Sequence, residues 1–218
     1  METVLTRDAL LILFEKVKQV ILARKADIGD LDAACGDGDL GVTMELGFRA
    51  VAEGLTALQG EDIGTLLMKS GMNFNRAASS TFGTIMATAL MRAGKVVTGR
   101  DDLEPIHMID MLRAAEDGIR QRGKAQPGDK TVLDALIPLN ETLSHHIESG
   151  KNLPDALDKT VDAVRLAVEK TKEMTAKTGR SRWLGDRAAG TPDPGAVVLL
   201  WMLEAFSEGI HNLDDAVA

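Results

Sequence analysis

Apolar residues recur at helical spacing through almost the whole of this chain of 218 residues. The first such segment contains Leu10, Leu13, Val17 and Ile21, and comparable segments follow as far as Phe206. Aromatic residues make up only 3% of the sequence and Tyr is absent, whereas the helix formers Ala, Leu, Glu and Lys are abundant. We identify no dependable strand, and we therefore expect an all-α fold.

Start and stop signals divide the chain into eight expected helices joined by short connections. Asp62 is expected to cap the third helix, Pro105 and Pro194 to open the fifth and the last, and Pro138 to kink the sixth. No stretch resembles a linker, so residues 1–218 are expected to form one domain, a single antiparallel eight-helix bundle or barrel. The helices are expected at about 10–21, 41–58, 62–73, 80–92, 105–122, 131–143, 152–177 and 194–206.

An acidic, glycine-rich stretch lies between the first two expected helices. It places Asp32, Asp37 and Asp39 within eight residues and continues through Gly41 into the next helix. Carboxylate oxygens are preferred ligands of hard divalent cations, and the N-terminus of a helix favours anions. The stretch could therefore hold metal ions and phosphates together, as a Mg-nucleotide requires.

Three short motifs match known patterns only in part. Gly36–Gly41 matches a dinucleotide-binding pattern, but no β-rich strand precedes it. An EF-hand loop from Asp37 would need Glu at its twelfth position, where the chain has Phe48. Residues 118–124 resemble a P-loop, but Ala125 stands where Ser or Thr should bind Mg²⁺. The remaining alternative is a solvated turn whose Asp residues cap the next helix.

The positions of the unusual connections favour a composite site. In an antiparallel bundle, connections after odd-numbered helices lie at the same end. The three that combine Gly with charged residues, 27–43, 123–131 and 178–195, follow the first, fifth and seventh helices. The connection after the third helix, which carries Ser79 and Ser80, reaches the same end by the same count. We therefore expect these four segments to meet.

Composition excludes several classes of function. The net charge of −8 argues against nucleic acid or an anionic membrane as a partner. The single Cys35 excludes an intrachain disulfide, and no apolar run is long enough for a membrane span. With no signal peptide recognised, we expect a cytoplasmic protein. The four histidines lie outside the glycine-rich connections, so we assign no catalytic residue.

Three blocks of the sequence together resemble the nucleotide-binding L subunit of the dihydroxyacetone kinase family. They keep the family's order and span most of the chain. The blocks are Asp32-x4-Asp37-Gly38-Asp39-x-Gly41-x-x-Met44, Gly123-Lys-Ala-x-Pro-Gly-Asp-Lys-Thr131, and Gly179-Arg180-Ser181-x-x-Leu184-Gly185-x-Arg187-x4-Pro192-Asp193-Pro194-Gly195-Ala196.

The resemblance implies an eight-helix barrel that holds ADP or ATP, together with about two Mg²⁺ ions, at one end. It also implies a separate K subunit that holds the ketose, and in some members a phosphotransferase-system protein as phosphoryl donor. Carried over by motif, the metal ligands would be Asp32, Asp37 and Asp39. The nucleotide-binding residues would be Leu40, Gly41, Val42, Thr43, Ser79, Ser80, Gly123, Val132, Arg180, Asp193, Pro194 and Gly195.

Two departures from the family pattern stand out. Leu40 occupies a position where the family usually has His, and Arg76-Ala-Ala-Ser79-Ser80 replaces a Gly-Gly-Ala-Ser-Gly turn. They suggest a relative with a different ketose or partner. The expected function is a kinase subunit that is inactive without its partner. The alternatives are the nucleotide domain of a fatty-acid-type kinase and a non-catalytic helical module stabilised by Mg-nucleotide.

Overall fold

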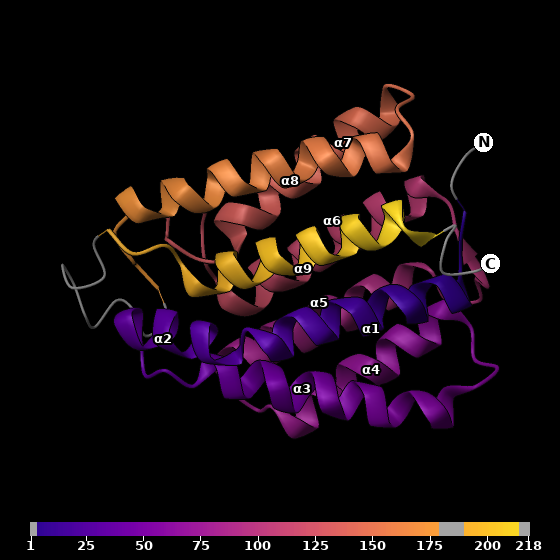
Figure 1. Ribbon diagram of the computed structural model, residues 1–218, viewed down its shortest axis with the longest axis horizontal. Coiled ribbons are helices and arrows are strands. Elements are labelled where there is room, and N and C mark those ends of the chain that lie inside the picture. The colour runs from indigo at the N-terminus through magenta and orange to yellow at the C-terminus, as the bar shows by residue number, and fades with distance from the viewer. Residues whose placement is uncertain (1–3, 179–189, 214–218) are drawn as a thin grey trace.

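The computed structural model describes residues 4–178 and 190–213, which are almost entirely helical (Figure 1). Nine α-helices occur in these ranges, together with two short 3₁₀ helices and a pair of two-residue strands. The elements are β1 (Leu5–Thr6), α1 (Arg7–Ala23), α2 (Lys25–Cys35), α3 (Leu40–Leu55), η1 (Thr56–Leu58), α4 (Ile63–Ala77), α5 (Thr81–Val96), β2 (Asp102–Leu103), α6 (Pro105–Gly123), α7 (Leu133–Glu148), α8 (Leu153–Lys170), η2 (Thr171–Glu173) and α9 (Pro194–His211).

Eight of the helices form a closed ring. From α3 to α9 each helix packs against the next one in the chain, α9 packs against α1, and α1 packs against α3. Figure 1 shows α1 and α9, the first and last of the described helices, side by side across the molecule. This arrangement confirms the expected all-α barrel. None of the described helices combines the length and the apolar character that crossing a bilayer requires.

The ninth helix, α2, lies where a loop was predicted. Only Arg24 separates it from α1, and it packs against α3 and α9. Its sequence contains several Asp residues and a glycine, and only Ile28 and Cys35 are buried along it, so it has almost no apolar stripe to detect. The acidic loop is therefore shorter than predicted and comprises Gly36–Asp39 between α2 and α3.

Two other differences from the prediction are small. Helix α8 ends at Lys170 rather than near residue 177, and η2 follows it. Strands β1 and β2 form an antiparallel pair in which Leu5 lies opposite Leu103, and both leucines are fully buried. The strands are too short to produce a recognisable period-2 pattern. They join the start of α1 to the segment before α6.

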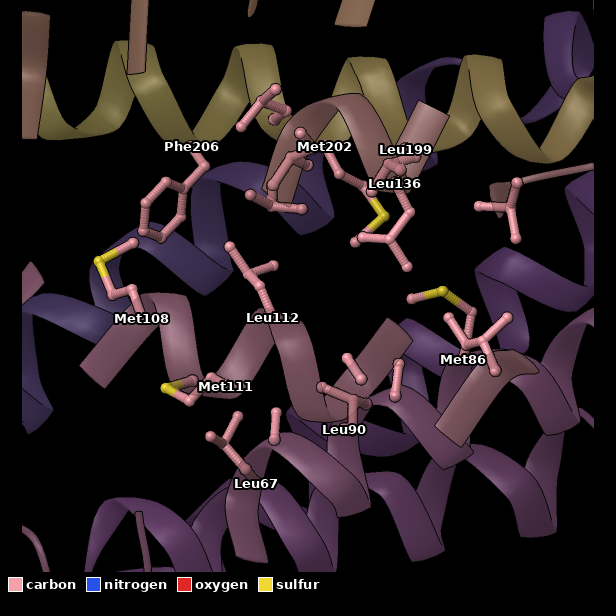
Figure 2. A pocket seen from close by; sticks show the side chains of 18 of the residues that line it. Leu67, Met86, Leu90, Met108, Met111, Leu112, Leu136, Leu199, Met202 and Phe206 are labelled. Atoms are coloured by element: carbon pink, nitrogen blue, oxygen red, sulfur yellow. The ribbon is translucent and has the colours of Figure 1, made fainter. Parts of the chain in front are cut away.

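The ring encloses an apolar cavity of about 340 Å³ (Figure 2). Every residue that lines it is apolar, and most come from α5, α6, α7 and α9. Figure 2 shows Met86, Met111, Leu112 and Met202 among the side chains around this space. A second apolar cavity, of about 180 Å³, shares Met86 and Met202 with the first. The centre of the barrel is therefore incompletely filled by side chains.

Candidate functional site

A pocket of about 150 Å³ lies where the connections at one end of the ring meet. The acidic loop, the start of α5, the turn before α7 and the start of α9 all contribute to it, so the structure brings together the four segments that the sequence placed at one end. The lining residues are Asp32, Asp37, Asp39, Leu40, Ser80, Thr81, Phe82, Ile85, Lys130, Thr131, Val132, Thr178, Asp193, Pro194 and Gly195.

Three carboxylates converge on one side of this pocket. One ligand atom from each of Asp32, Asp37 and Asp39 can be chosen so that all three lie within 4.8 Å of one another. Asp32 occupies the last turn of α2, and its Oδ2 accepts a hydrogen bond of 3.1 Å from the backbone N–H of Leu40. Gly38, with φ of +76°, turns the chain between the other two aspartates.

The charges in this cluster suit a divalent cation. Burial, and then the charge of Asp32, raise the pKa of Asp39 above its ordinary value. A bound cation would offset this repulsion. Mg²⁺ commonly takes a few carboxylate oxygens and completes its shell with water and substrate phosphates, and the aspartates leave the rest of the pocket for such ligands. The oxygen donors therefore fit a magnesium site.

The start of α5 lies beside the start of α3 and provides hydroxyl groups. Ser80 is the N-cap of α5, and its Oγ accepts a 3.0 Å hydrogen bond from the backbone N–H of Gly83. Thr43, in the first turns of α3, donates a second 3.0 Å hydrogen bond to the same oxygen. The two helix starts are thus joined by a direct bond between side chains.

The turn before α7 is organised by two buried carboxylates. Asp134 accepts hydrogen bonds from the backbone N–H groups of Gly128 and Thr131, and Asp129 accepts one of 2.7 Å from Gln126. Between them, Lys130 adopts a left-handed φ of 60° and is only 3% exposed. The turn therefore holds a buried cation on the wall of a pocket that also carries four aspartates.

Asp193 caps the start of α9 from a buried position. Its Oδ2 accepts a 2.8 Å hydrogen bond from the N–H of Ala196, and its own N–H donates to Oγ1 of Thr171 at 2.9 Å. Burial raises the pKa of Asp193 to about 7; the charge of Asp134 adds to this increase, while the Ala196 N–H and Lys130 oppose it. The carboxylate is therefore sensitive to any charge that enters the pocket.

The predicted site residues fall into three groups. Nine of them line the pocket: Asp32, Asp37, Asp39, Leu40, Ser80, Val132, Asp193, Pro194 and Gly195. Five others lie near the same end without lining it: Gly41, Val42, Thr43, Ser79 and Gly123. Among these, Gly41 is buried against the backbone of α2, whereas Val42 and Gly123 are exposed. Arg180 lies outside the described residues.

Sequence reasoning missed several residues of the lining. Lys130 and Thr131 belong to a block that the sequence singled out, and a lysine after Gly-Asp in a glycine-rich turn was the available signal. Phe82 and Ile85 were identified only as apolar positions of a helix. Nothing in their spacing distinguishes a wall residue of a pocket from a core residue, because both are apolar and helical.

The four histidines lie elsewhere, as the sequence predicted. His107 Nδ1 accepts a 3.0 Å hydrogen bond from the N–H of Glu104 at the start of α6. His211 contacts Asp158 at 2.9 Å, and the rings of His145 and His146 lie 5.2 Å apart on α7. Each of these groups serves local structure rather than the pocket.

Comparison with known proteins identifies the family. Residues 34–208 match the DAK2 domain. The chain is 35% identical over 174 residues to the ADP-binding subunit DhaL of the PEP-dependent dihydroxyacetone kinase of Escherichia coli, covering 80% of this chain and 83% of that subunit. It is also 35% identical over 197 residues to the L-erythrulose kinase of Pectobacterium atrosepticum, which covers 89% of this chain but only 33% of that longer protein.

The fold comparison agrees. The crystal structure of the dihydroxyacetone kinase of C. freundii superposes with a TM-score of 0.70 at 25% sequence identity, over 91% of this chain and 34% of that one. A structure of the same kinase in complex with AMP-PNP and Mg²⁺ matches equally well, with a TM-score of 0.70. The chain thus belongs to the DAK2 domain family and is a homologue of the ADP-binding L subunits of dihydroxyacetone kinases.

Proposed function

We propose that this chain is the Mg-nucleotide-binding subunit of a kinase that phosphorylates a small hydroxyketone held by a K-type partner subunit. The observation that carries the proposal is the convergence of Asp32, Asp37 and Asp39 in one pocket with the starts of α5 and α9. This gives ligands for a cation and donors for an anion in the same small volume, in a chain that belongs to the DAK2 family.

The pocket suits phosphoryl transfer because that reaction depends on positioning and charge stabilisation more than on covalent chemistry. The three aspartates would hold about two Mg²⁺ ions, which would supply positive charge to stabilise the phosphates of ADP or ATP. Ser80 would donate to phosphate oxygens, and Asp193–Gly195 and Val132 would line the nucleotide. In the transfer, the γ-phosphoryl group leaves the bridging oxygen of ATP and bonds to a hydroxyl oxygen of the ketose, whose proton passes to a base on the partner.

We assign the ketose-binding site to a partner subunit because the four histidines of this chain make their contacts away from the pocket. The E. coli relative is named as a subunit, while the L-erythrulose kinase is about three times as long as the matched region. Dihydroxyacetone and erythrulose are therefore both candidate acceptors. The phosphoryl donor would be ATP, or a phosphotransferase-system protein that recharges bound ADP.

Calorimetric titration with Mg-ADP tests the binding half of the proposal. The wild-type protein is expected to bind, and Asp37→Asn is expected to abolish detectable binding while the helical content stays unchanged, because an exposed loop aspartate contributes little to core packing. Asp117→Asn is the matched control, since Asp117 is an exposed aspartate on α6. Equal affinity of Asp37→Asn and the wild type would contradict the metal-ligand assignment.

A transfer assay tests the catalytic half. The chain alone is expected to bind Mg-ATP without phosphorylating dihydroxyacetone or erythrulose, and addition of a K-type subunit should start turnover. Steady ketose-dependent ATP consumption by the chain alone, absent from Asp37→Asn, would contradict the two-component proposal. Nucleotide binding without transfer to any ketose would favour a non-catalytic module, and transfer to a fatty acid would favour the fatty-acid-type alternative.

A further inference from the structure

The bond between Thr43 and Ser80 constrains the direction in which the Ser80 hydroxyl points. A serine hydroxyl has one proton to donate and two lone pairs that accept. In Ser80, one lone pair accepts the N–H of Gly83 at 3.0 Å and the other accepts the hydroxyl of Thr43, also at 3.0 Å. Either partner of a hydroxyl pair can donate. While Thr43 donates, both acceptor positions of Ser80 are occupied, and Ser80 has only its proton left for a further contact.

The remaining proton of Ser80 could be donated to a ligand in the pocket. Ser80 lines the pocket together with Asp39, Leu40 and Thr81, so a donor at this residue borders the volume in which phosphates are proposed to sit. Phosphate oxygens only accept hydrogen bonds. A hydroxyl that presented a lone pair there would repel the ligand, whereas one that presents its proton would stabilise it.

Thr43 itself is placed to act on Ser80 and not on the ligand. It is 5% exposed and is not among the residues that line the pocket. Its hydroxyl lies between α3 and α5, two helices that also pack against each other. A contribution of Thr43 to nucleotide binding would therefore pass through the Ser80 hydroxyl.

We infer that Thr43 is a positioning residue, whose hydroxyl holds Ser80 as a hydrogen-bond donor toward a phosphate oxygen of the bound Mg-nucleotide. The inference rests on the proposed function, and it changes the role expected for Thr43 from a direct phosphate ligand to an indirect one. It also means that the two residues should contribute to affinity as one unit, because removing either of them removes the same oriented proton.

The test is a double-mutant cycle read by titration with Mg-ADP. Thr43→Val, which keeps the shape but lacks the hydroxyl, should weaken binding about 5- to 10-fold, the scale of one ordinary hydrogen bond. Thr43→Ser should restore nearly wild-type affinity. In the Ser80→Ala background, Thr43→Val should have almost no further effect. Thr88→Val is the matched control, because the Thr88 hydroxyl donates to the Thr84 carbonyl on α5, away from the pocket.

Each outcome decides the inference. If Thr43→Val binds as tightly as the wild type, or weakens binding by the same factor with and without the Ser80 hydroxyl, Thr43 does not act through Ser80. Should the valine variant fail to fold, Thr43→Ala supplies the same comparison, since it also lacks the donor. Failure of the wild type to bind Mg-ADP would contradict the proposed function instead, and the inference would fall with it.

Discussion

Gly195, in the first turn of α9, lies directly against the ring of Phe82 on α5. A Cβ at position 195 would lie 2.6 Å from Phe82 Cε2 and 3.2 Å from Asp193 Oδ2. Phe82 lines both the polar pocket and the apolar cavity inside the barrel. The contact therefore connects the start of the last helix to the wall that separates the two spaces.

Replacing Gly195 with Ala should destabilise the nucleotide-free protein by about 1–3 kcal/mol, because the added methyl group forces the Phe82 ring or the Asp193 cap to move. Phe82→Leu should recover part of this loss in the double variant, since the smaller side chain leaves space. Chemical denaturation measures both. Gly123→Ala is the control, because a Cβ at position 123 meets nothing within 4 Å. If Gly195→Ala lowers the free energy of unfolding by the same amount in the wild type and in the Phe82→Leu background, the Phe82 ring is not the obstacle.

Mg-ADP should raise the thermal midpoint, and EDTA should remove the increase. A ligand that binds only the native state stabilises it by about 2.7 kcal/mol at a hundredfold excess over Kd, which corresponds to a shift of roughly 5–10 °C for a chain of this length. A melting curve with ADP, with Mg²⁺, with both, and with both plus EDTA measures the effect. A shift from ADP that survives EDTA would mean that the nucleotide binds without the aspartate-bound metal.

Asp62 should make stability depend on pH in the acid range. It is the N-cap of α4, where hydrogen bonds from the Thr65 hydroxyl, the Thr65 N–H and the Gly99 N–H lower its pKa from 3.8 to about 2. Because the folded pKa is below the unfolded one, the stabilisation is present above about pH 4 and is lost as the pH falls toward 2.

The variant Asp62→Asn keeps a capping oxygen but does not titrate, so it isolates this effect. The wild type should exceed it in free energy of unfolding by about 1 kcal/mol at pH 6, and the difference should shrink as the pH falls below about 4. Urea unfolding at a series of pH values measures the difference. A difference in free energy of unfolding that stayed constant between pH 6 and pH 3 would contradict a lowered pKa for Asp62.

Filling the central cavity should stabilise the barrel. Ala89 on α5 lines this space of about 340 Å³, and Ala89→Leu adds apolar atoms to it without displacing a polar group. A gain of about 0.5–2 kcal/mol is expected. Ala26→Leu, on an exposed position of α2, should change stability by less than about 0.5 kcal/mol. A loss of stability in Ala89→Leu would indicate that the cavity walls cannot accommodate the larger side chain.

The sequence was most informative where the physical signal was periodic or clustered. Seven of the ring's helices begin close to the predicted residues, because caps such as Asp62, Ser80 and Asn152 mark their starts. The three-aspartate cluster was also recognisable, because the carboxylates fall within eight residues immediately before a predicted helix and carboxylate oxygens are preferred ligands of hard cations. Four connections were predicted to meet at one end of the ring, and they do so although α2 was not predicted. Helix α2 lies at the end of the ring where α1 stops, so it leaves the directions of the later helices unchanged.

The remainder was not accessible from the sequence for identifiable reasons. Helix α2 buries only two residues, so it has no periodicity to read. Lys130 lines the pocket from a left-handed backbone conformation that lysine rarely adopts, in a turn whose neighbouring N–H groups donate to Asp129 and Asp134. The bond between Thr43 and Ser80 joins residues 37 positions apart, and no local pattern reports on it.

The pairing of α1 with α9 gives the barrel a seam formed by the two ends of the chain. The pocket likewise joins segments far apart in the chain, since it takes Asp32, Asp37, Asp39 and Leu40 from α2, the acidic loop and α3, and Asp193–Gly195 from the start of α9. Contacts of such long sequence separation form late in folding because the loop-closure entropy must be overcome first. A bound Mg-nucleotide would therefore hold these distant segments together in the folded state, and it would slow unfolding much more than it accelerates folding.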